Sequence, residues 1–165
     1  MNQENSEIVN KLKLPSEETT TATNHDIPED KWFEYKVKAQ PHHTDYSGVV
    51  WHGNYLTWLE SARVELLASL GVDFARLVIL GCDLPIVELS MKYHRSVTLG
   101  RNVIVKTRLF KMVGVRIFWD QEIKSEDGQD LFLTARVGLV GLDRGKGNII
   151  RQLPDNLNSA LHKIK

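Results

Sequence analysis

Apolar and polar side chains alternate along five segments of the chain, a pattern typical of strands with one buried face. The first segment runs from about residue 32 to residue 40, and the other four cover 87–93, 103–109, 115–123 and 131–139. Turn dipeptides separate the last four, namely Leu99-Gly100, Val113-Gly114 and Asp127-Gly128. Because connections this short make neighbouring strands antiparallel, we expect an antiparallel sheet.

A helical period lies between the first strand and the other four. Apolar residues recur every three or four positions from Tyr55 to Leu70, which predicts a helix from about His52 or Gly53 to Leu70 that ends at Gly71. Its apolar face is wide, so the helix should be largely enclosed. We also expect a short helix over 74–80 capped by Asp73, and a last one over 156–164. The order of these elements predicts an α+β architecture in which one antiparallel sheet covers one helix.

The first 30 residues differ in composition from the rest of the chain. A run of Glu, Thr and Ala over 17–24 has little to bury, which predicts a flexible N-terminal tail over 1–30 and a single domain over 31–165. The whole chain has 165 residues, of which 42% are hydrophobic and 25% charged. These are ordinary values for a globular protein that can build a sizeable core.

Charge and cysteine content narrow the class of partner and compartment. The formal net charge is zero, so bulk charge gives no reason to expect nucleic acid or an anionic membrane as partner. Cys82 is the one cysteine and cannot form an intramolecular disulfide, which favours a reducing compartment. No apolar stretch is long enough to span a membrane, and the first residues do not resemble a secretory signal. We therefore expect a cytoplasmic location.

The stretch from Thr44 to His52 carries the candidate chemistry. Asp45 lies in a loop that contains Gly48, and His52 follows seven residues after Asp45, where the long helix is predicted to begin. A carboxylate and the free N–H groups of a helix N-terminus can thus face one point in space. That pairing suits attack on a carbonyl carbon, because one group acts as base or nucleophile and the other stabilises the developing negative charge.

The motif Thr44-Asp45-x-x-Gly48-Val49-Val50-x-His52-x-Asn54-Tyr55-Leu56-x-x-x-Glu60-x-Ala62-Arg63 resembles the acyl-CoA thioesterases of the 4-hydroxybenzoyl-CoA thioesterase family. Tyr93-His94-Arg95 is similar to that family's second strand, and the order of elements matches over about residues 32–155. The resemblance implies a hotdog fold, in which a five-stranded antiparallel sheet wraps a long central helix. It also implies hydrolysis of an acyl-CoA to a free acid and CoA.

By this resemblance, Asp45 is the catalytic carboxylate, acting either as the nucleophile or as the base that activates water. His52 marks the backbone N–H that polarises the thioester carbonyl, and its side chain is a candidate for orienting Asp45 or the substrate. The expected substrate-binding residues are Gly48, Val50, Trp51, Tyr55, Tyr93 and Arg95. Basic residues around the second strand, namely Lys92, Arg95 and Arg101, are candidates for the phosphates of CoA.

Two further groups of residues have a more ordinary interpretation. Glu60 and Arg63 lie three residues apart on the long helix, where they form either an intrahelical ion pair or a partly buried structural support for the site. His42, His43, Asp45 and His52 could be read as metal ligands, but their spacing matches no known site, so we expect no metal. No redox cofactor is expected either, because CoA belongs to the substrate.

Several alternatives stay open on the sequence alone. A hotdog hydratase or dehydratase would act on an enoyl thioester without releasing CoA, and a non-catalytic protein of this fold would only bind acyl-CoA or acyl carrier protein. The acyl group could be aromatic or a short or medium aliphatic chain. The exposed edge of the expected sheet predicts a homodimer or homotetramer, and an acyl carrier protein is a further candidate partner.

Overall fold

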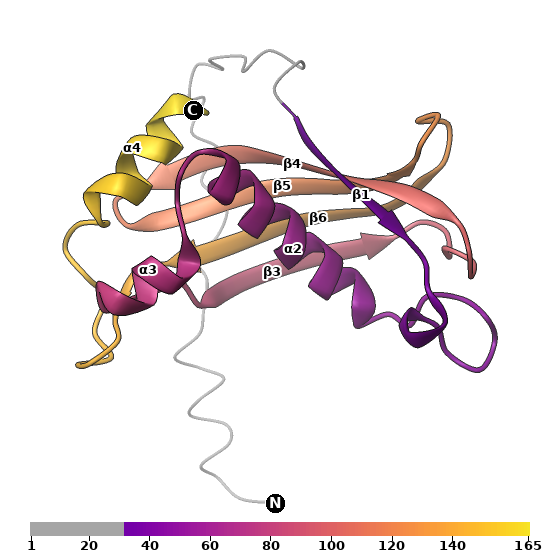
Figure 1. The fold of residues 1–165 in the computed structure, drawn as a ribbon, viewed down its shortest axis with the longest axis horizontal. Helices are drawn as coiled ribbons and strands as arrows, with labels where there is room; N and C mark the ends of the chain where they lie inside the picture. The colour runs from indigo at the N-terminus through magenta and orange to yellow at the C-terminus, as the bar shows by residue number, and fades with distance from the viewer. Residues whose placement is uncertain (1–31) are drawn as a thin grey trace, which may run out of the picture.

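The computed structural model describes residues 32–165, so the tail predicted over 1–30 lies outside the described residues and stays a prediction. Its main feature is a five-stranded antiparallel sheet in the order β1-β4-β5-β6-β3 (Figure 1). The strands are β1 (Phe33–Lys38), β3 (Ile86–Tyr93), β4 (Asn102–Val113), β5 (Arg116–Ser125) and β6 (Leu131–Val140). All five predicted strands and the antiparallel pairing are therefore confirmed.

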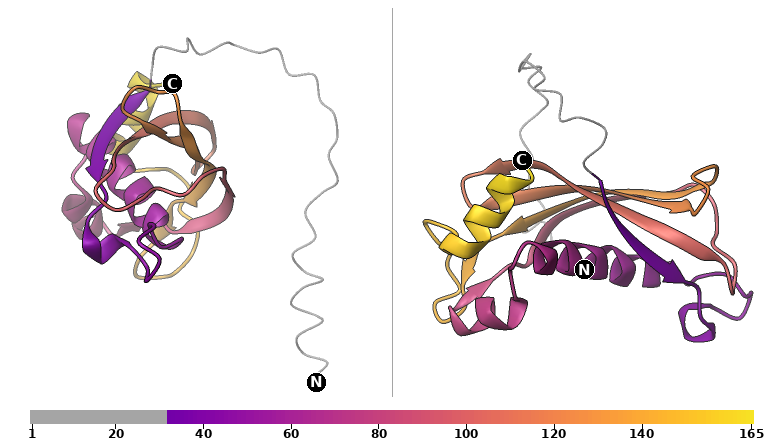
Figure 2. Two further views of the ribbon diagram at one scale, coloured as in Figure 1. Left: turned by 90° about the vertical axis from the view of Figure 1, so that its right-hand side faces the viewer. Right: turned by 45° about the horizontal axis from the view of Figure 1, so that its top comes forward.

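The sheet arches over one long helix, α2 (Asn54–Ser69), as Figure 2 shows. On β4, alternate residues from Val103 to Leu109 are buried toward the helix, while the residues between them are partly exposed on the other face. The helix begins two residues later than the first predicted position, because His52 and Gly53 form a turn before it. This arrangement is the hotdog architecture predicted above.

The core beneath α2 has two hydrophobic clusters. One includes Tyr55, Trp58 and Leu59 with Val97 and Phe132. The other surrounds the second half of the helix and takes in Trp119 and the C-terminal helix α4 (Asp155–Lys163). Most members of both clusters are almost completely buried, and burial of apolar side chains is the main favourable contribution to folding.

A link over residues 94–101 joins β3 to β4 without pairing them. The two strands lie apart in the sheet, since β6 and β5 separate them, so the Leu99-Gly100 turn does not close a hairpin. The link runs past the ends of β5 and β6, where the N–H of His94 donates to the carbonyl of Phe132 (2.8 Å). Further along, the N–H of Leu99 donates to the carbonyl of Gly48 (3.0 Å). The link therefore holds the candidate loop against the end of the sheet.

The remaining elements are short. Asp73 caps α3 (Phe74–Ile79) as predicted, accepting from the N–H of Ala75 (2.8 Å). The predicted loop after β1 contains a 3-10 turn, η1 (Pro41–His43), and a two-stranded ribbon pairs β2 (Cys82–Asp83) with β7 (Leu142–Asp143). The alternation pattern missed this ribbon because two residues are too few to show a period. Within residues 32–165, no helix combines the length and the hydrophobicity needed to cross a membrane.

Strand β3 forms an open edge of the sheet. It pairs with β6 on one side, and α2 packs mainly against β1 and β4 at the other edge. Apolar side chains of β3 are consequently exposed, among them Val87 (49%), Leu89 (42%) and Tyr93 (49%). The helix is thus less enclosed by this single chain than its apolar face predicted.

Candidate active site

The loop that carries Asp45 is fixed by its own hydrogen bonds. The N–H of Asp45 donates to the carbonyl of Val49 (2.9 Å), and the N–H of Ser47 donates to Oδ1 of Asp45 (2.8 Å). The second bond closes a turn of the kind that Asp residues commonly form. Gly48 has a φ of 72°, a conformation that favours glycine, which agrees with the tight loop expected from the sequence. One carboxylate oxygen is thereby held by the loop.

A cavity of about 350 Å³ opens beside this loop. Its lining comes from three segments, which are the loop, the start of α2 and the end of β3 with the link that follows. The lining residues are Asp45, Val50, His52, Tyr55, Tyr93, His94, Arg95 and Ser96. The structure thus brings six of the predicted site residues together around one cavity, although Tyr93 and Asp45 lie 48 positions apart in the chain.

Backbone N–H groups at the start of α2 find no acceptor among residues 32–165. Within residues 32–165, the N–H groups of His52 and Gly53 donate to no acceptor, whereas the next one, of Asn54, donates to the carbonyl of Trp51 (2.9 Å). Free N–H groups before a helix carry partial positive charge and suit an oxygen that becomes negative. The side chain of Asn54 holds this helix start against η1, since it donates to the carbonyl of His43 (2.6 Å).

Two tyrosines connect the helix start to the end of β3. The Tyr93 hydroxyl donates to the carbonyl of His52 (3.0 Å), and its ring packs edge-on against Tyr55 with 5.5 Å between centroids. The Tyr55 hydroxyl accepts from the N–H of Val97 (3.0 Å), and burial raises the pKa of Tyr55 despite that bond. Tyr93 therefore fixes the orientation of the His52–Gly53 peptide group, in addition to lining the cavity.

His43, in the turn before the loop, contacts the backbone of Gln40 and the ring of Trp58. Its Nδ1 accepts from the N–H of Gln40 (3.0 Å), and its ring contacts Trp58 edge-on at 5.2 Å. Burial, helped by the neighbouring His42, lowers the pKa of His43, so the neutral ring is favoured in the folded protein. No three His, Cys, Asp or Glu side chains in the described part of the chain gather closely enough to hold a metal ion. That the protein uses no metal stays an expectation.

The other predicted residues lie outside the cavity lining. Gly48 shapes the loop, Trp51 is half exposed beside it, and Glu60 is exposed on α2. Arg63 is buried (5% exposed) and donates to Oε1 of Gln121 (2.6 Å), with no ion pair to Glu60. Burial lowers the pKa of Arg63 to about 10, and Glu60 opposes that shift. Among the two alternatives for Arg63, the structure thus favours structural support over an ion pair.

Sequence reasoning assigned no role to two residues that line the cavity, His94 and Ser96. His94 falls inside the Tyr93-His94-Arg95 triplet, so its position between two assigned residues was the available signal. Its Nε2 lies 3.0 Å from the hydroxyl oxygen of Thr134 on β6. Ser96 belongs to no motif in the sequence. It lines the cavity only because the link after β3 passes there.

Comparison with known proteins agrees with this fold. The family model described as the thioesterase superfamily matches residues 47–132, a range that begins two residues after Asp45. A putative esterase of Synechocystis sp. is 49% identical over 136 residues, which cover 82% of each chain. The chloroplastic acyl-acyl carrier protein thioesterase ATL2 of Arabidopsis thaliana is 30% identical over 67% of this chain and 58% of its own.

Among solved structures, the DHNA-CoA thioesterase of Staphylococcus aureus superposes with a TM-score of 0.75 and 29% identity, covering 81% of this chain and 90% of that one. Fold and comparisons together define a thioester hydrolase of the hotdog fold. The chain belongs to the thioesterase superfamily.

Proposed function

We propose that this protein hydrolyses the thioester of an acyl-CoA, with Asp45 as the catalytic carboxylate and the backbone N–H of His52 as the oxyanion donor. The observation that carries the proposal is that Asp45 and the start of α2 line the same cavity, and that the N–H groups of His52 and Gly53 have no acceptor within residues 32–165. The DHNA-CoA thioesterase that superposes on the chain acts on a CoA thioester, which supports the choice of CoA.

The reaction follows from the arrangement of these groups. A thioester carbonyl placed in the cavity would direct its oxygen to the N–H of His52, which stabilises the negative charge of the tetrahedral intermediate. Asp45 either attacks the carbonyl carbon, giving an anhydride that water then cleaves, or takes a proton from a water that attacks. In both routes the C–S bond breaks, CoA leaves as a thiolate that takes up a proton, and the acid is released.

The cavity lining indicates which kinds of acyl group suit the site. Val50 and Tyr55 are buried at its base, and Tyr93 adds an aromatic ring, so an apolar or aromatic acyl group suits this part of the site. We assign Tyr55 and Val50 to acyl contact, while Trp51 lies half exposed beside the loop. Aromatic and short or medium aliphatic acyl groups both agree with these contacts.

The active protein is proposed to be a homodimer in which β3 pairs with β3 of a second copy. Strand β3 has one free edge and exposed apolar residues, and Tyr93 at its end lines the cavity. Pairing along this edge would cover those residues and enclose the cavity with a second chain.

Replacement of one carboxylate tests the catalytic assignment. Asp45→Asn should abolish CoA release, which a free-thiol assay measures over a panel of aromatic and aliphatic acyl-CoAs, because an amide can neither attack the carbonyl nor accept the proton of water. The matched control is Asp73→Asn. Position 73 lies outside the cavity, and Asn caps a helix as well as Asp does. Near-normal turnover by Asp45→Asn would refute the mechanism, and product formation without thiol release would favour a hydratase.

A further inference from the structure

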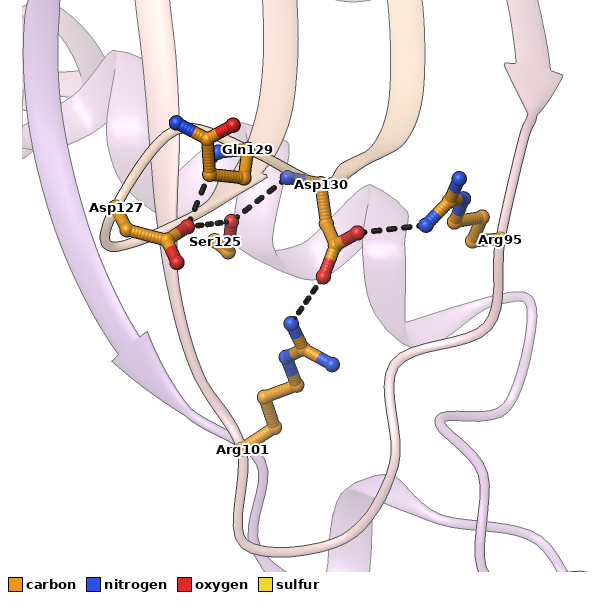
Figure 3. Close-up of polar contacts among 6 residues, drawn as sticks. All are labelled: Arg95, Arg101, Ser125, Asp127, Gln129 and Asp130. Carbon is orange, nitrogen blue, oxygen red and sulfur yellow. Dashed lines mark hydrogen bonds and ion pairs between the residues drawn. The ribbon is translucent and has the colours of Figure 1, made fainter.

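Two arginines at the rim of the site share one carboxylate. Nη1 of Arg95 donates to Oδ1 of Asp130 (2.6 Å), and Nη2 of Arg101 donates to Oδ2 of the same residue, as Figure 3 shows. Arg95 and Arg101 belong to the two ends of the link between β3 and β4, whereas Asp130 comes from the hairpin between β5 and β6. Because each carboxylate oxygen binds one arginine, the two guanidinium groups are held side by side.

The hairpin fixes the position of the shared carboxylate. The N–H of Asp130 donates to Oγ of Ser125 (2.9 Å), and Ser125 in turn bonds to Oδ1 of Asp127. The N–H of Gln129 donates to the same Asp127 oxygen (3.0 Å), so three polar contacts hold the turn (Figure 3). Asp130 is itself partly buried, with its side chain 27% exposed. Its carboxylate is consequently a fixed point, toward which the longer arginines reach.

The arginine pair remains available to a ligand. The side chains of Arg95 and Arg101 are 66% and 41% exposed, and Arg101 lies over the ring of Phe132 with 4.9 Å to the centroid. A guanidinium has five N–H donors, and Asp130 uses only part of this set. Asp130 offsets one arginine charge, and Asp127 on the same hairpin also interacts with Arg101, so the pair attracts a ligand chiefly through its free N–H donors. Such a cluster matches an anion with several oxygens, of which phosphate is the best fit.

We propose that Arg95 and Arg101 bind a phosphate of the thiol carrier, and that Asp130 is the positioning residue that holds them as a pair. This inference rests on the proposed thioesterase function. Arg95 lines the cavity beside Asp45, and the link leads from there to Arg101 at the start of β4. The carrier arm leaving the thioester would thus pass the pair. Both CoA and an acyl carrier protein attach this arm through a phosphate, so the shared chemistry is a phosphate ester.

One acyl group on three carriers tests the proposal. The thioesters are acyl-pantetheine, which lacks phosphate, acyl-CoA and acyl carrier protein, and the variants are Arg95→Gln, Arg101→Gln and Asp130→Asn. Each variant should raise KM for acyl-CoA about tenfold with little change in kcat, because one charge-assisted hydrogen bond is lost or misplaced. KM for acyl-pantetheine should not change. Arg116→Gln is the matched control, since Arg116 begins β5 and lies about 30 Å along that strand from Ser125.

The outcomes separate the possible interpretations. An equal rise of KM for acyl-CoA and acyl carrier protein identifies the phosphate on the shared arm, and a rise confined to CoA identifies its nucleotide phosphates; both support the phosphate site. An equal rise for acyl-pantetheine, or no rise at all, overturns it. If Asp130→Asn instead lowers KM for acyl-CoA, Asp130 competes with the ligand, and its positioning role is wrong.

Binding of CoA itself keeps the inference separate from the proposed function. If the wild-type protein hydrolyses none of the thioesters, the proposed function fails. Calorimetric titration with CoA would still measure how much Arg95 and Arg101 contribute to the affinity for CoA. Binding of CoA that weakens about tenfold in Arg95→Gln and Arg101→Gln supports the phosphate site, and equal binding overturns it. Thermal unfolding of each variant verifies that the hairpin and link remain folded.

Discussion

At the scale of single residues, the proposed site depends on the backbone on both sides of His52. The structure shows that the Tyr93 hydroxyl donates to the carbonyl of this residue, while its N–H is free among the described residues. The His52 carbonyl shares its peptide plane with the N–H of Gly53, while the N–H of His52 lies in the preceding plane. The bond from Tyr93 therefore fixes the Gly53 N–H directly and restricts the His52 N–H only through the backbone angles of His52. Tyr93 thus lines the cavity and also holds the backbone at the start of α2.

The mutation Tyr93→Phe separates these two roles. It keeps the ring that packs against Tyr55 and removes the hydroxyl, so kcat should fall about tenfold with little change in KM. The loss should be smaller than the 10²–10³ that is typical of removing an oxyanion donor itself. Steady-state kinetics measure the split between kcat and KM. Tyr46→Phe is the control, because Tyr46 is fully exposed on the same loop, and equal effects of the two mutations would argue against the positioning role.

His43 gives the loop a dependence on pH. Because its folded pKa lies below the ordinary value of 6.5, the unfolded chain binds a proton more readily than the folded one. The contribution of His43 to stability is therefore complete above pH 6.5 and is lost as the pH falls from there toward the folded pKa. Urea unfolding between pH 7.5 and 5 should show this decline, and His43→Gln should make the decline less steep.

His162→Gln provides the comparison for that experiment, since it removes one histidine from an exposed position on α4. An unchanged slope in His43→Gln would show that the ring does not resist protonation in the folded protein.

The sequence predicted candidate catalytic residues that the structure places around one cavity, but not the residues that hold them. Asp45, Gly48 and His52 could be found because they lie within one short motif. Asp130 could not, because an Asp in a hairpin is ordinary, and its importance depends on two arginines that approach it from another segment. Likewise, no pattern in the sequence pairs Tyr93 with the carbonyl of His52, since that contact joins residues 41 positions apart.

At the scale of elements, helix α2 and the sheet are joined by a buried polar contact. Arg63 on α2 donates to Gln121 on β5, and the amide of Gln121 donates to the carbonyl of Leu59 and to the hydroxyl of Thr107, each at 2.8 Å. All three polar side chains are at most 5% exposed. Removing these polar groups from water costs free energy, but the directional hydrogen bonds fix the orientation of the helix on the sheet. An apolar surface alone would allow the helix to slide.

Two mutations should show how the buried charge of Arg63 affects the free energy of unfolding. Gln121→Leu leaves the Arg63 guanidinium buried without its acceptor and should lower the free energy of unfolding by about 3 kcal/mol. Adding Arg63→Met removes the charge and should recover most of that loss. Urea unfolding measures both variants. A double mutant as unstable as Gln121→Leu alone would indicate that lost packing, not the unpaired charge, causes the effect.

Elements were predicted wherever a period could develop. Strand β4 and helix α2 each contain enough residues for alternation or helical spacing to be recognised, and their positions agree with the structure to within a few residues. The ribbon of β2 and β7 and the 3-10 turn η1 have only two or three residues each, so only tertiary contacts define them. The order of strands in the sheet also depends on tertiary contacts, which explains why the path of the link could not be predicted.

At the scale of the whole molecule, the two edges of the sheet differ. Both edge strands carry charged residues on their outer face, but their apolar faces differ in exposure. The apolar face of β1 is partly buried where α2 packs on it, whereas the corresponding face of β3 exposes Leu89 and Tyr93. This asymmetry supports a homodimer through β3 and argues against open-ended assembly through both edges.

Lysine on the open edge should dissociate the proposed dimer. Val87→Lys and Leu89→Lys place a charge where the partner would bury an apolar residue, while in a single chain both positions are exposed. Analytical ultracentrifugation should show a shift from dimer to monomer. Val113→Lys is the matched control, because Val113 is an exposed apolar residue (57%) at the end of β4, away from the β3 edge. A wild-type monomer at micromolar concentration would contradict the prediction.

The link over residues 94–101 also bears on how the protein folds. The link connects an edge strand, β3, to β4, which lies three positions away across the sheet, and it contributes residues to the cavity. Contacts between segments so distant in sequence form slowly, because the closing of long loops costs entropy before any contact repays it. During refolding, secondary structure should therefore return before enzymatic activity, and the site is expected to be among the last parts of the molecule to assemble.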